Sequence, residues 1–167
     1  MDRVNRAAVA LGSNVGDRGG HLAYAVSRLA DYFTSLKVSR SVTTAPVNVP
    51  GDQPDFLNAA AELRTNLSPR GLLNLCLDAE RRLKRVRSER WGPRLIDMDI
   101  LVFGDRILDE EGLELPHPRM LQRAFVLVPL AEIAADFRID GLPVSGHLAK
   151  LDAGGIEKLP GRDWWKN

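Results

Sequence analysis

Residues 95–103 read LIDMDILVF, a strongly apolar run that only two aspartates interrupt. The length of the run and its branched and aromatic side chains predict a β-strand with a buried face. Strand side chains alternate between two faces, so Asp97 and Asp99 lie on one face while Met98 covers the other. The run therefore predicts a sheet that covers a hydrophobic core and holds two carboxylates together on one strand.

The two carboxylates predict either a metal site or a solvated sheet face. Like charges held this close beside a hydrophobic core are costly unless a cation compensates them. Mg²⁺ is a suitable cation, because it binds carboxylate oxygens and fills its remaining positions with water and phosphate oxygens. In the alternative interpretation Asp97 and Asp99 face solvent and bind nothing, and these two residues alone favour neither interpretation.

A basic segment lies directly upstream of this strand. Residues 85–94 read RVRSERWGPR, have no apolar period and contain a Gly-Pro pair, so they predict a loop. Arginine side chains bind phosphate oxygens bidentately and stay charged at any working pH. An arginine-rich loop beside two carboxylates indicates phosphoryl transfer, in which metal ions and arginines stabilise the transferring group. Nucleic-acid binding is the alternative, because Trp91 among arginines could stack on a base.

Three further residues are candidates for substrate contacts. Phe56 and Asn58 follow a proline-rich loop (residues 45–55) and share one face if their segment is a strand. An aromatic ring beside an amide suits a flat heterocycle, although two ordinary core and edge residues are the simpler interpretation. His117 lies between two prolines, which make this segment rigid. Its imidazole is therefore a candidate phosphate ligand or acid–base partner. The alternative is a turn histidine without such a role.

Composition and charge exclude several classes of protein. The 167 residues are 44% hydrophobic and 27% charged, which is typical of a globular protein and excludes a disordered or collagen-like chain. The net charge of +1 provides no overall attraction for nucleic acid or an acidic membrane surface. The single cysteine, Cys76, excludes an intrachain disulfide and lies among leucines, which predicts a core residue rather than a nucleophile.

The chain shows no sign of a membrane segment or a signal peptide. No apolar run reaches the length of about 20 residues that a membrane-spanning helix needs. The first residues also lack the apolar run of a signal peptide. We therefore expect a cytoplasmic protein, and we further expect a monomer without nucleic-acid or membrane partners.

The remaining periodicities predict the fold class. Apolar residues at intervals of three and four predict helices over residues 21–36 and 69–84, and Pro129 is expected to start another helix. Alternating or apolar runs predict strands over residues 6–11, 37–43, 56–63 and 95–103. Helices among short strands with hairpin-length connections indicate an α/β (α+β) sandwich with a mostly antiparallel sheet. The length predicts one domain over residues 1–167.

Several motifs follow one another between residues 9 and 133. They are ALGSN (10–14), DQPDFLNA (52–59), RVR (85–87) with RWGPR (90–94), DMDIL (97–101), and LPHP (115–118) followed by RAF (123–125). In this order the chain resembles the 6-hydroxymethyl-7,8-dihydropterin pyrophosphokinase family of folate biosynthesis, which transfers diphosphate from ATP to a pterin alcohol. The stretch from residue 90 to residue 101 is the most specific part of the resemblance.

The resemblance implies a ferredoxin-like sandwich, a pyrophosphokinase activity that depends on two Mg²⁺ ions, and ATP as co-substrate. It implies that Asp97 and Asp99 hold the ions and that Arg85 and Arg94 assist the transfer. The implied ATP contacts are Glu80, Arg85, Arg87, Trp91, Arg94, Ile100 and His117. The implied pterin contacts are Ala45, Pro46, Asn48, Phe56, Asn58 and Phe125, with the two phenylalanines on opposite sides of the ring. The chain departs from the family's usual pattern on the ATP side, at Leu77, Lys84, Gly112, Glu114 and Pro118.

Overall fold

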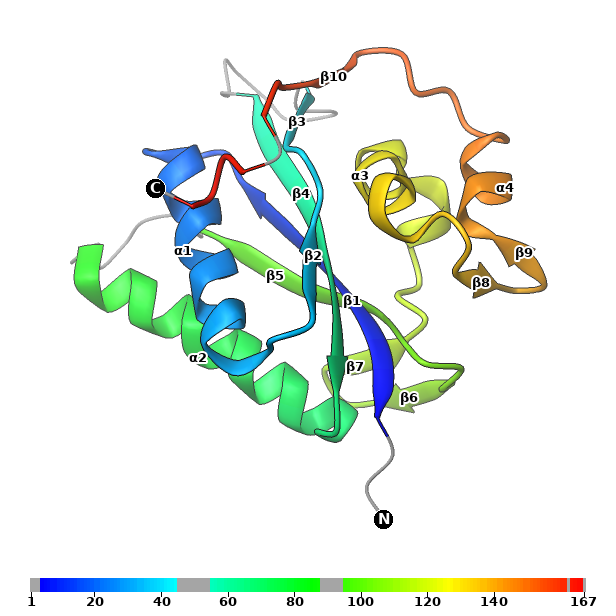
Figure 1. Ribbon diagram of the computed structural model, residues 1–167, viewed down its shortest axis with the longest axis horizontal. Coiled ribbons are helices and arrows are strands. Elements are labelled where there is room, and N and C mark those ends of the chain that lie inside the picture. Colours follow the sequence, from blue (N-terminus) through cyan, green and yellow to red (C-terminus); the bar gives the residue numbers. More distant parts are fainter. Residues whose placement is uncertain (1–3, 45–54, 88–94, 162, 167) are drawn as a thin grey trace.

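An antiparallel sheet of six strands runs through the middle of the protein (Figure 1). The computed structural model describes residues 4–44, 55–87, 95–161 and 163–166, with the backbone alone at 85–87. The strands lie in the order β10 (Ile156–Lys158), β3 (Val42–Thr44), β4 (Phe56–Thr65), β1 (Asn5–Ser13) and β5 (Asp97–Phe103), and β2 (Leu36–Val38) also pairs with β4. The strand that carries the two aspartates, β5, therefore lies at one edge of the sheet.

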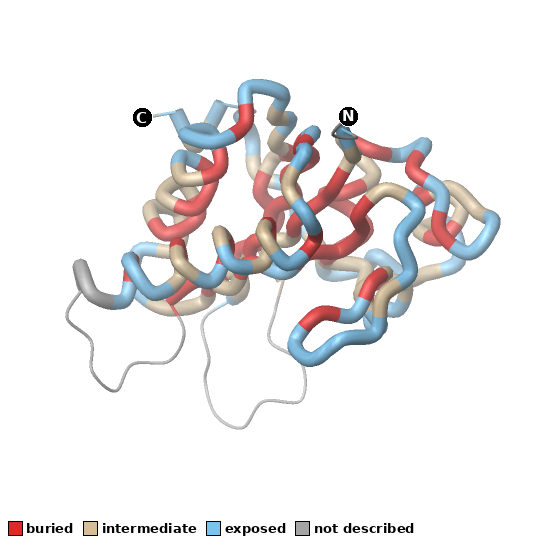
Figure 2. Tube along the Cα trace, turned by 90° about the horizontal axis from the view of Figure 1, so that it is seen from below, coloured by how far each residue is buried: buried red, intermediate tan, exposed pale blue. Residues whose placement is uncertain are grey.

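Helices cover both faces of this sheet (Figure 1). α1 (Arg18–Tyr32) and α2 (Pro69–Arg87) lie on one face, and α3 (Ala124–Ala134) and α4 (Val144–Leu148) lie on the other. A first hydrophobic cluster is buried against α1 and α2 and a second against α3, and buried segments gather between helices and strands in Figure 2. Among the described residues, no helix is long and apolar enough to cross a membrane.

The residues before α1 and α2 explain where these helices begin. Asp17 accepts a hydrogen bond from the backbone N–H of Gly20 at 3.0 Å and so caps α1. Ser68 accepts the N–H of Gly71 at 3.0 Å, and Pro69 is the first residue of α2. Both arrangements satisfy backbone donors that have no partner within the helix.

A short hairpin lies beside the start of α2. It consists of β6 (Leu108–Glu110) and β7 (Leu113–Leu115), joined through Glu111 and Gly112, and the φ of 73° at the glycine favours that residue type. Arg70 of α2 donates to Glu110 Oε1 at 3.1 Å and to the carbonyl oxygen of Glu111 at 3.0 Å. These bonds attach the hairpin to the helix, next to β5.

The chain after the hairpin runs to the second face of the sheet. A 3₁₀ turn (Met120–Gln122) leads into α3, and a second hairpin of β8 (Arg138–Ile139) and β9 (Leu142–Pro143) leads into α4. β10 then pairs with β3 and extends the sheet. Trp164 Nε1 donates to the carbonyl oxygen of Ser39 at 2.9 Å, and Trp164 and Trp165 contact the first hydrophobic cluster. The C-terminal segment therefore packs on the body of the protein.

Three boundaries predicted from the sequence are wrong. The helix expected over residues 21–36 ends at Tyr32, because Phe33 has an extended backbone and β2 already begins at Leu36. The strand expected over residues 37–43 is two strands, since the Ser39 hydroxyl accepts the N–H of Ala60 at 2.9 Å between β2 and β3. Residues 85–87, expected in a loop, form the last turn of α2.

Pro129 does not start a helix but lies inside α3. Because α3 begins at Ala124, the missing N–H of Pro129 leaves the carbonyl of Phe125 without its usual helical donor. Leu127 and Leu130 are fully buried in the second hydrophobic cluster. Their burial stabilises the helix across the proline, so tertiary packing overrides the local preference.

Candidate active site

The ends of three adjacent strands meet at one end of the sheet. Gly12 of β1 pairs with Asn58 of β4 on one side and with Asp97 of β5 on the other. The neighbouring residues Leu57 and Met98 belong to the first hydrophobic cluster, so the side chains of Asn58 and Asp97 face the opposite, α3 side. Asn58 and Asp97 are two strand spacings apart, roughly 10 Å, with only a glycine between them.

The close approach of Asn58 leaves no room for a side chain at Gly12. A Cβ atom at Gly12 would lie 2.8 Å from Asn58 Oδ1, which is closer than carbon and oxygen atoms normally approach. The glycine therefore allows the Asn58 amide to lie over β1. Gly12 was not among the predicted site residues, and the signal that could have found it is a glycine inside a strand, which often marks a close approach.

Asn58 offers a buried hydrogen-bond donor to a ligand. The residue is 8% exposed, and its Nδ2 has no hydrogen-bond partner among the described residues. Buried side-chain amides are normally paired, and an unpaired one costs roughly 1–3 kcal/mol. The orphaned donor therefore points to a ligand with an acceptor atom at this position.

Aromatic side chains lie on the same side of the sheet as Asn58. Phe56 precedes Asn58 by two residues on β4 and is half-buried. Phe125 is half-buried in the first turn of α3, the helix that packs on β4. The guanidinium of Arg123 lies 5.7 Å from the centre of the Phe125 ring. The predicted arrangement of Phe56 and Asn58 on one face of a strand is confirmed.

Asp97 and Asp99 lie on one face of the edge strand, as the alternation predicts. Met98 between them is buried, whereas Asp97 is half-buried and Asp99 is exposed. In the described part of the chain, no group of three or more His, Cys, Asp and Glu side chains could hold a metal ion. Two carboxylates alone leave most positions of a six-coordinate ion open to water and phosphate oxygens, which is how Mg²⁺ usually binds.

A pocket of about 290 Å³ lies along the free edge of β5, and we call it the β5-edge pocket. Its lining residues come from α2, β5, the β6–β7 hairpin and the segment around His117, and they are Leu73, Met98, Asp99, Ile100, Glu110, Gly112, Leu113, Glu114, His117 and Pro118. The pocket brings together three predicted site residues, Asp99, Ile100 and His117. Gly112, Glu114 and Pro118, which the resemblance puts on the ATP side, also line the pocket. Glu110 and Leu113 were not predicted, because no local pattern connects them to β5.

The free edge of β5 presents backbone hydrogen-bonding groups to this pocket. The N–H of Met98 donates to Glu80 Oε2 at 2.8 Å and therefore points away from β1. Backbone groups of an antiparallel strand alternate in direction, so the N–H and C=O of Ile100 point to the same free side. Glu80 thus binds the backbone of β5 beside the pocket and is not part of its lining.

The imidazole of His117 is held in one orientation at this pocket. Its backbone N–H donates to the carbonyl oxygen of Leu101 at 2.8 Å, and its Nδ1 accepts the N–H of Arg119 at 3.2 Å. The neutral ring therefore carries its proton on Nε2. Burial lowers the pKa of His117 below its ordinary value, and the opposing charge of Asp99 does not offset this. At neutral pH the ring offers an Nε2–H donor.

Cys76 is a core residue, as predicted. It is fully buried in α2, and burial raises the pKa of its thiol to about 12, with the charges of Glu80 and Asp99 acting in the same direction. A thiol that stays protonated is a poor nucleophile. Cys76 therefore takes no part in the chemistry of the site.

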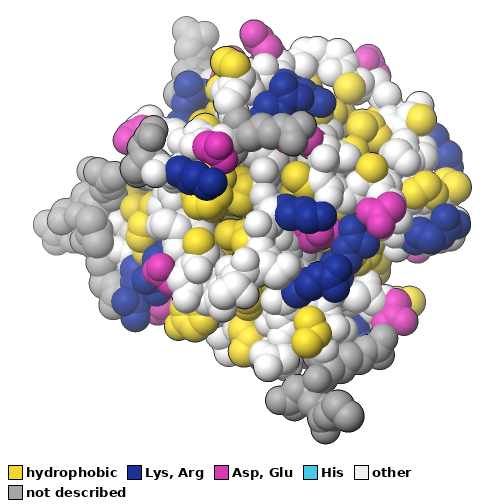
Figure 3. Space-filling model, viewed as in Figure 1, with side chains coloured by type: hydrophobic (Ala, Val, Ile, Leu, Met, Phe, Trp, Pro, Cys, Tyr) yellow, Lys and Arg dark blue, Asp and Glu magenta, His cyan; other side chains and the backbone are white. Residues whose placement is uncertain are grey.

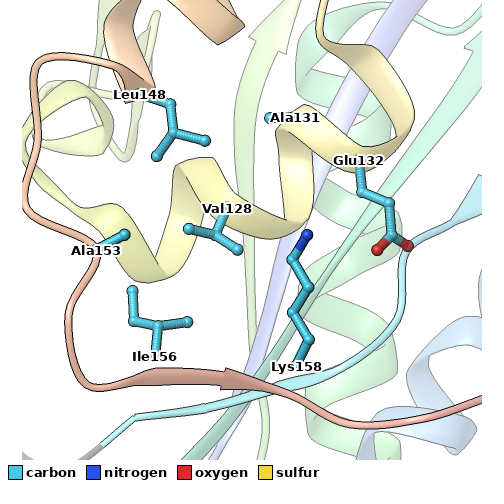
Figure 4. Close-up of a pocket in the computed structure, with 7 residues that line it drawn as sticks. All are labelled: Val128, Ala131, Glu132, Leu148, Ala153, Ile156 and Lys158. Carbon is cyan, nitrogen blue, oxygen red and sulfur yellow. The ribbon is translucent and has the colours of Figure 1, made fainter.

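A second pocket, of about 320 Å³, lies between α3 and β10 (Figure 4). Figure 4 shows Val128 and Glu132 of α3 facing Ile156 and Lys158 of β10. The Glu132 carboxylate accepts the backbone N–H of Arg40 at 2.7 Å and its Nε–H at 2.8 Å, so both oxygens are engaged within the protein. None of the predicted site residues lines this pocket.

Several predicted site residues lie outside the described residues. They are Ala45, Pro46, Asn48, Trp91 and Arg94, and for Arg85 and Arg87 only the backbone is described, at the end of α2. The described neighbours of these segments do lie at the site. Thr44 pairs with Phe56, and Leu95 and Ile96 lead directly into β5.

The fold and the site together define a class of protein. The succession β1, α1, β2, β4, α2 and β5, with α1 and α2 on one face of the antiparallel sheet, is ferredoxin-like, and α3 and α4 cover the other face. Paired carboxylates beside a pocket with a histidine donor are suited to phosphoryl-group transfer. Within this class, the match to the 7,8-dihydro-6-hydroxymethylpterin-pyrophosphokinase (HPPK) family covers residues 8–135, and the chain belongs to this family.

Similar proteins agree with this assignment over nearly the whole chain. Proteins named 2-amino-4-hydroxy-6-hydroxymethyldihydropteridine pyrophosphokinase are 48% identical over 157 residues in Methylorubrum extorquens and 43% identical over 164 residues in Pseudomonas aeruginosa. The alignments cover 93% and 95% of this chain and 99% of each relative. Wild-type Plasmodium falciparum HPPK-DHPS with pterin and p-hydroxybenzoate has a similar fold, with a TM-score of 0.71 at 15% identity over 90% of this chain. This chain spans 43% of that longer one.

These findings confirm the predicted family and the ferredoxin-like sandwich with its mostly antiparallel sheet. They also make the chain an enzyme of the pyrophosphokinase class. The alternative of a nucleic-acid-binding module without catalysis is not supported. On the face shown in Figure 3, basic and acidic side chains lie side by side and form no extended basic surface.

Proposed function

We propose that this chain transfers the diphosphate of ATP to 6-hydroxymethyl-7,8-dihydropterin in folate biosynthesis, at the end of the sheet where β1, β4 and β5 meet. Membership of the pyrophosphokinase family supports the reaction itself. One observation carries the placement of the site: the buried Nδ2 of Asn58, which has no partner among the described residues, lies across Gly12 from the carboxylates of β5. This arrangement suits a flat heterocycle that must be held beside phosphate groups.

The pterin would be bound on the α3 side of β4. The Nδ2–H of Asn58 donates to an acceptor at the edge of the ring, which removes the cost of leaving this donor unpaired. Phe56 and Phe125 stack on the two sides of the ring, since flat heterocycles pack well between aromatic side chains. We assign the rest of the pocket to the backbone around Ala45, Pro46 and Asn48.

The nucleotide would be bound in the β5-edge pocket. The N–H and C=O of Ile100 can pair with an acceptor and a donor on the edge of the adenine base. The Nε2–H of His117 can donate to a phosphate oxygen. Glu80 positions this edge through its hydrogen bond to the backbone of β5. We assign the remaining phosphate and nucleotide contacts to Arg85, Arg87, Trp91 and Arg94.

Asp97 and Asp99 are the residues that we assign to two Mg²⁺ ions. When bound, these ions supply neutralisation of the phosphate charge and orientation of the pterin hydroxyl. The two carboxylates lie on the edge strand, between the Asn58 side of the site and the β5-edge pocket. In this proposal they lie at the junction of the two substrates.

The reaction forms one bond and breaks one bond. The hydroxyl oxygen of the pterin bonds to the β-phosphorus of ATP, and the bond from the β-phosphorus to the bridging oxygen of the α-phosphate breaks, so AMP leaves. The hydroxyl proton passes to solvent, and we assign no general base. The protein contributes alignment: the pterin side chains fix the alcohol, and His117 with Arg85 and Arg94 fixes the phosphates.

We propose further that the enzyme acts in the cytoplasm as a single-domain monomer. Its partners would be the two small-molecule substrates, ATP and the pterin. The net charge of +1 supports the expectation that neither nucleic acid nor an acidic membrane surface is a partner.

Release of AMP from MgATP, measured with and without the pterin, tests this function. We expect pterin-dependent AMP from the wild type and none from Asp97→Ala, which keeps the fold because the side chain is only half-buried. Asp105→Ala is the matched control, since it removes an exposed aspartate beyond the other end of β5. A metal chelator is expected to stop the reaction and added Mg²⁺ to restore it.

Two outcomes would contradict the proposal. A folded wild type that releases no pterin-dependent AMP would overturn the reaction. Full activity of Asp97→Ala would overturn the assignment of the carboxylates to the metal ions.

A further inference from the structure

The first residue of β4 is paired with a neighbouring strand on one side only. Within the described ranges, the register of β1 with β4 runs as far as Ser13 and Leu57, so Phe56 has no partner strand on the β1 side. On its other side Phe56 pairs with Thr44, the last residue of the short strand β3. The start of β4 therefore needs a further contact on the β1 side to be held as firmly as the middle of the strand.

Arg18 supplies a hydrogen bond on that side. It is the first residue of α1, and its Nη1 donates to the carbonyl oxygen of Asp55 at 2.5 Å. This carbonyl belongs to the planar peptide unit that joins Asp55 to Phe56. Together with the pairing of Leu57, a fixed peptide unit limits the φ of Phe56 and thus the direction in which its ring leaves the backbone.

The segment that carries Arg18 is itself held in place. Ser13 Oγ and His21 Nδ1 are hydrogen-bonded at 3.3 Å, and both side chains are buried, so the end of β1 is joined to the start of α1. Asp17, directly before Arg18, caps the helix. The guanidinium therefore reaches the start of β4 from a base with a defined position.

We infer that Arg18 is a positioning residue for the pterin: its hydrogen bond to the backbone before Phe56 holds the Phe56 ring in the orientation that stacks on the pterin. The inference rests on the proposed function, because it requires that Phe56 binds the pterin. Arg18 belongs to none of the sets assigned to the metal ions, the pterin or the nucleotide.

The variant Arg18→Ala tests this inference by calorimetry and by AMP release. Calorimetry measures pterin binding to the full chain with Mg²⁺ and an ATP analogue that has a methylene group between the α- and β-phosphorus atoms, so transfer cannot occur. We expect Arg18→Ala to bind the pterin roughly fivefold more weakly and to raise the KM for the pterin by the same factor, because one hydrogen bond is lost. The kcat at saturating pterin is expected to change by less than about twofold.

The analogue alone is expected to bind to Arg18→Ala as to the wild type, since Arg18 does not line the β5-edge pocket. Arg18→Lys keeps a cationic donor and is expected to recover most of the pterin affinity. Arg64→Ala is the matched control, because it removes an exposed arginine near the other end of β4 and is expected to leave pterin binding unchanged. Thermal unfolding checks that each variant is folded.

The variant Phe56→Ala shows whether Arg18 acts through the Phe56 ring. If it does, adding Arg18→Ala to Phe56→Ala weakens pterin binding by less than about twofold more. A fivefold further loss in this background would overturn the inference, because Arg18 would then act by another route.

Other outcomes also separate this inference from the proposed function. Wild-type pterin affinity in Arg18→Ala, or an equal loss of nucleotide affinity, would overturn the role of Arg18. In either case pterin-dependent AMP release by the wild type would leave the function intact. A wild type that neither binds the pterin nor releases AMP would overturn the proposed function, and the inference with it.

Discussion

Gly12→Ala is expected to weaken pterin binding because it displaces the Asn58 amide. The added Cβ would lie 2.8 Å from Asn58 Oδ1, whereas carbon and oxygen atoms in contact are about 3.3 Å apart or more. Asn58 is 8% exposed and pairs with Val42 and Gly12 on its two sides, so the backbone gives it little freedom. The amide must therefore shift by about 0.5 Å or rotate, and its Nδ2–H no longer points to the ligand.

The size of the effect follows from the lost hydrogen bond. A buried donor or acceptor left unpaired costs roughly 1–3 kcal/mol, and about 2 kcal/mol corresponds to roughly 30-fold in the dissociation constant of the pterin. Overpacking at a buried site also costs roughly 1–3 kcal/mol of unfolding free energy, so the variant is expected to stay folded. Neither Gly12 nor Asn58 lines the β5-edge pocket, so nucleotide binding is expected to change by less than about twofold.

Calorimetry with the pterin, in the presence of the non-transferable ATP analogue, measures the expected loss. Titration with the analogue alone measures the nucleotide site separately. Gly19→Ala is the matched control, because it adds the same atom in α1 at a place where nothing lies within 4 Å. It is expected to bind the pterin as the wild type does.

Asn58→Ala provides the decisive comparison. If Gly12→Ala acts through the Asn58 amide, adding it to Asn58→Ala causes no further loss of pterin binding. Wild-type pterin affinity in Gly12→Ala would refute the reasoning. A double variant that binds roughly 30-fold more weakly than Asn58→Ala alone would refute it as well, because the glycine would then act independently of the amide.

Two further predictions concern the core and the α3 side of the sheet. Because burial raises the pKa of the Cys76 thiol to about 12, iodoacetamide at about pH 8 is expected to modify Cys76 only as fast as the protein unfolds, and a rate typical of a free thiol would contradict its burial. For Glu132, burial would raise the pKa, but the hydrogen bonds and charge of Arg40 outweigh it and lower the pKa below its ordinary value. The pair therefore stabilises the fold fully above the unfolded-state pKa, and this stabilisation is lost as the pH falls through the folded-state pKa. Glu132→Gln is expected to cost roughly 1–3 kcal/mol in denaturant unfolding at neutral pH and much less in acid, and an equal cost at both would exclude this linkage.

Much of the site was predictable because its signals are local. The alternation in residues 97–100 places two aspartates on one face and two apolar side chains on the other, and β5 shows this arrangement. The helix expected from residue 69 does begin at Pro69, and the preceding Ser68 caps it. These features depend on neighbouring residues and on the periods of helices and strands, which a single sequence contains. The order of the motifs along the chain also predicted the family, which the comparisons confirm.

The tertiary structure decided how distant residues combine. The register of β1 with β4 and β5 places Gly12 between Asn58 and Asp97, which are far apart in the sequence. The attachment of Glu110 to Arg70 likewise makes a remote hairpin a wall of the pocket beside β5. Burial of α3 overrides the expected helix start at Pro129. Sequence alone thus determined which residue types carry the chemistry, whereas strand register and burial, which arise from contacts between distant segments, decided which of them meet.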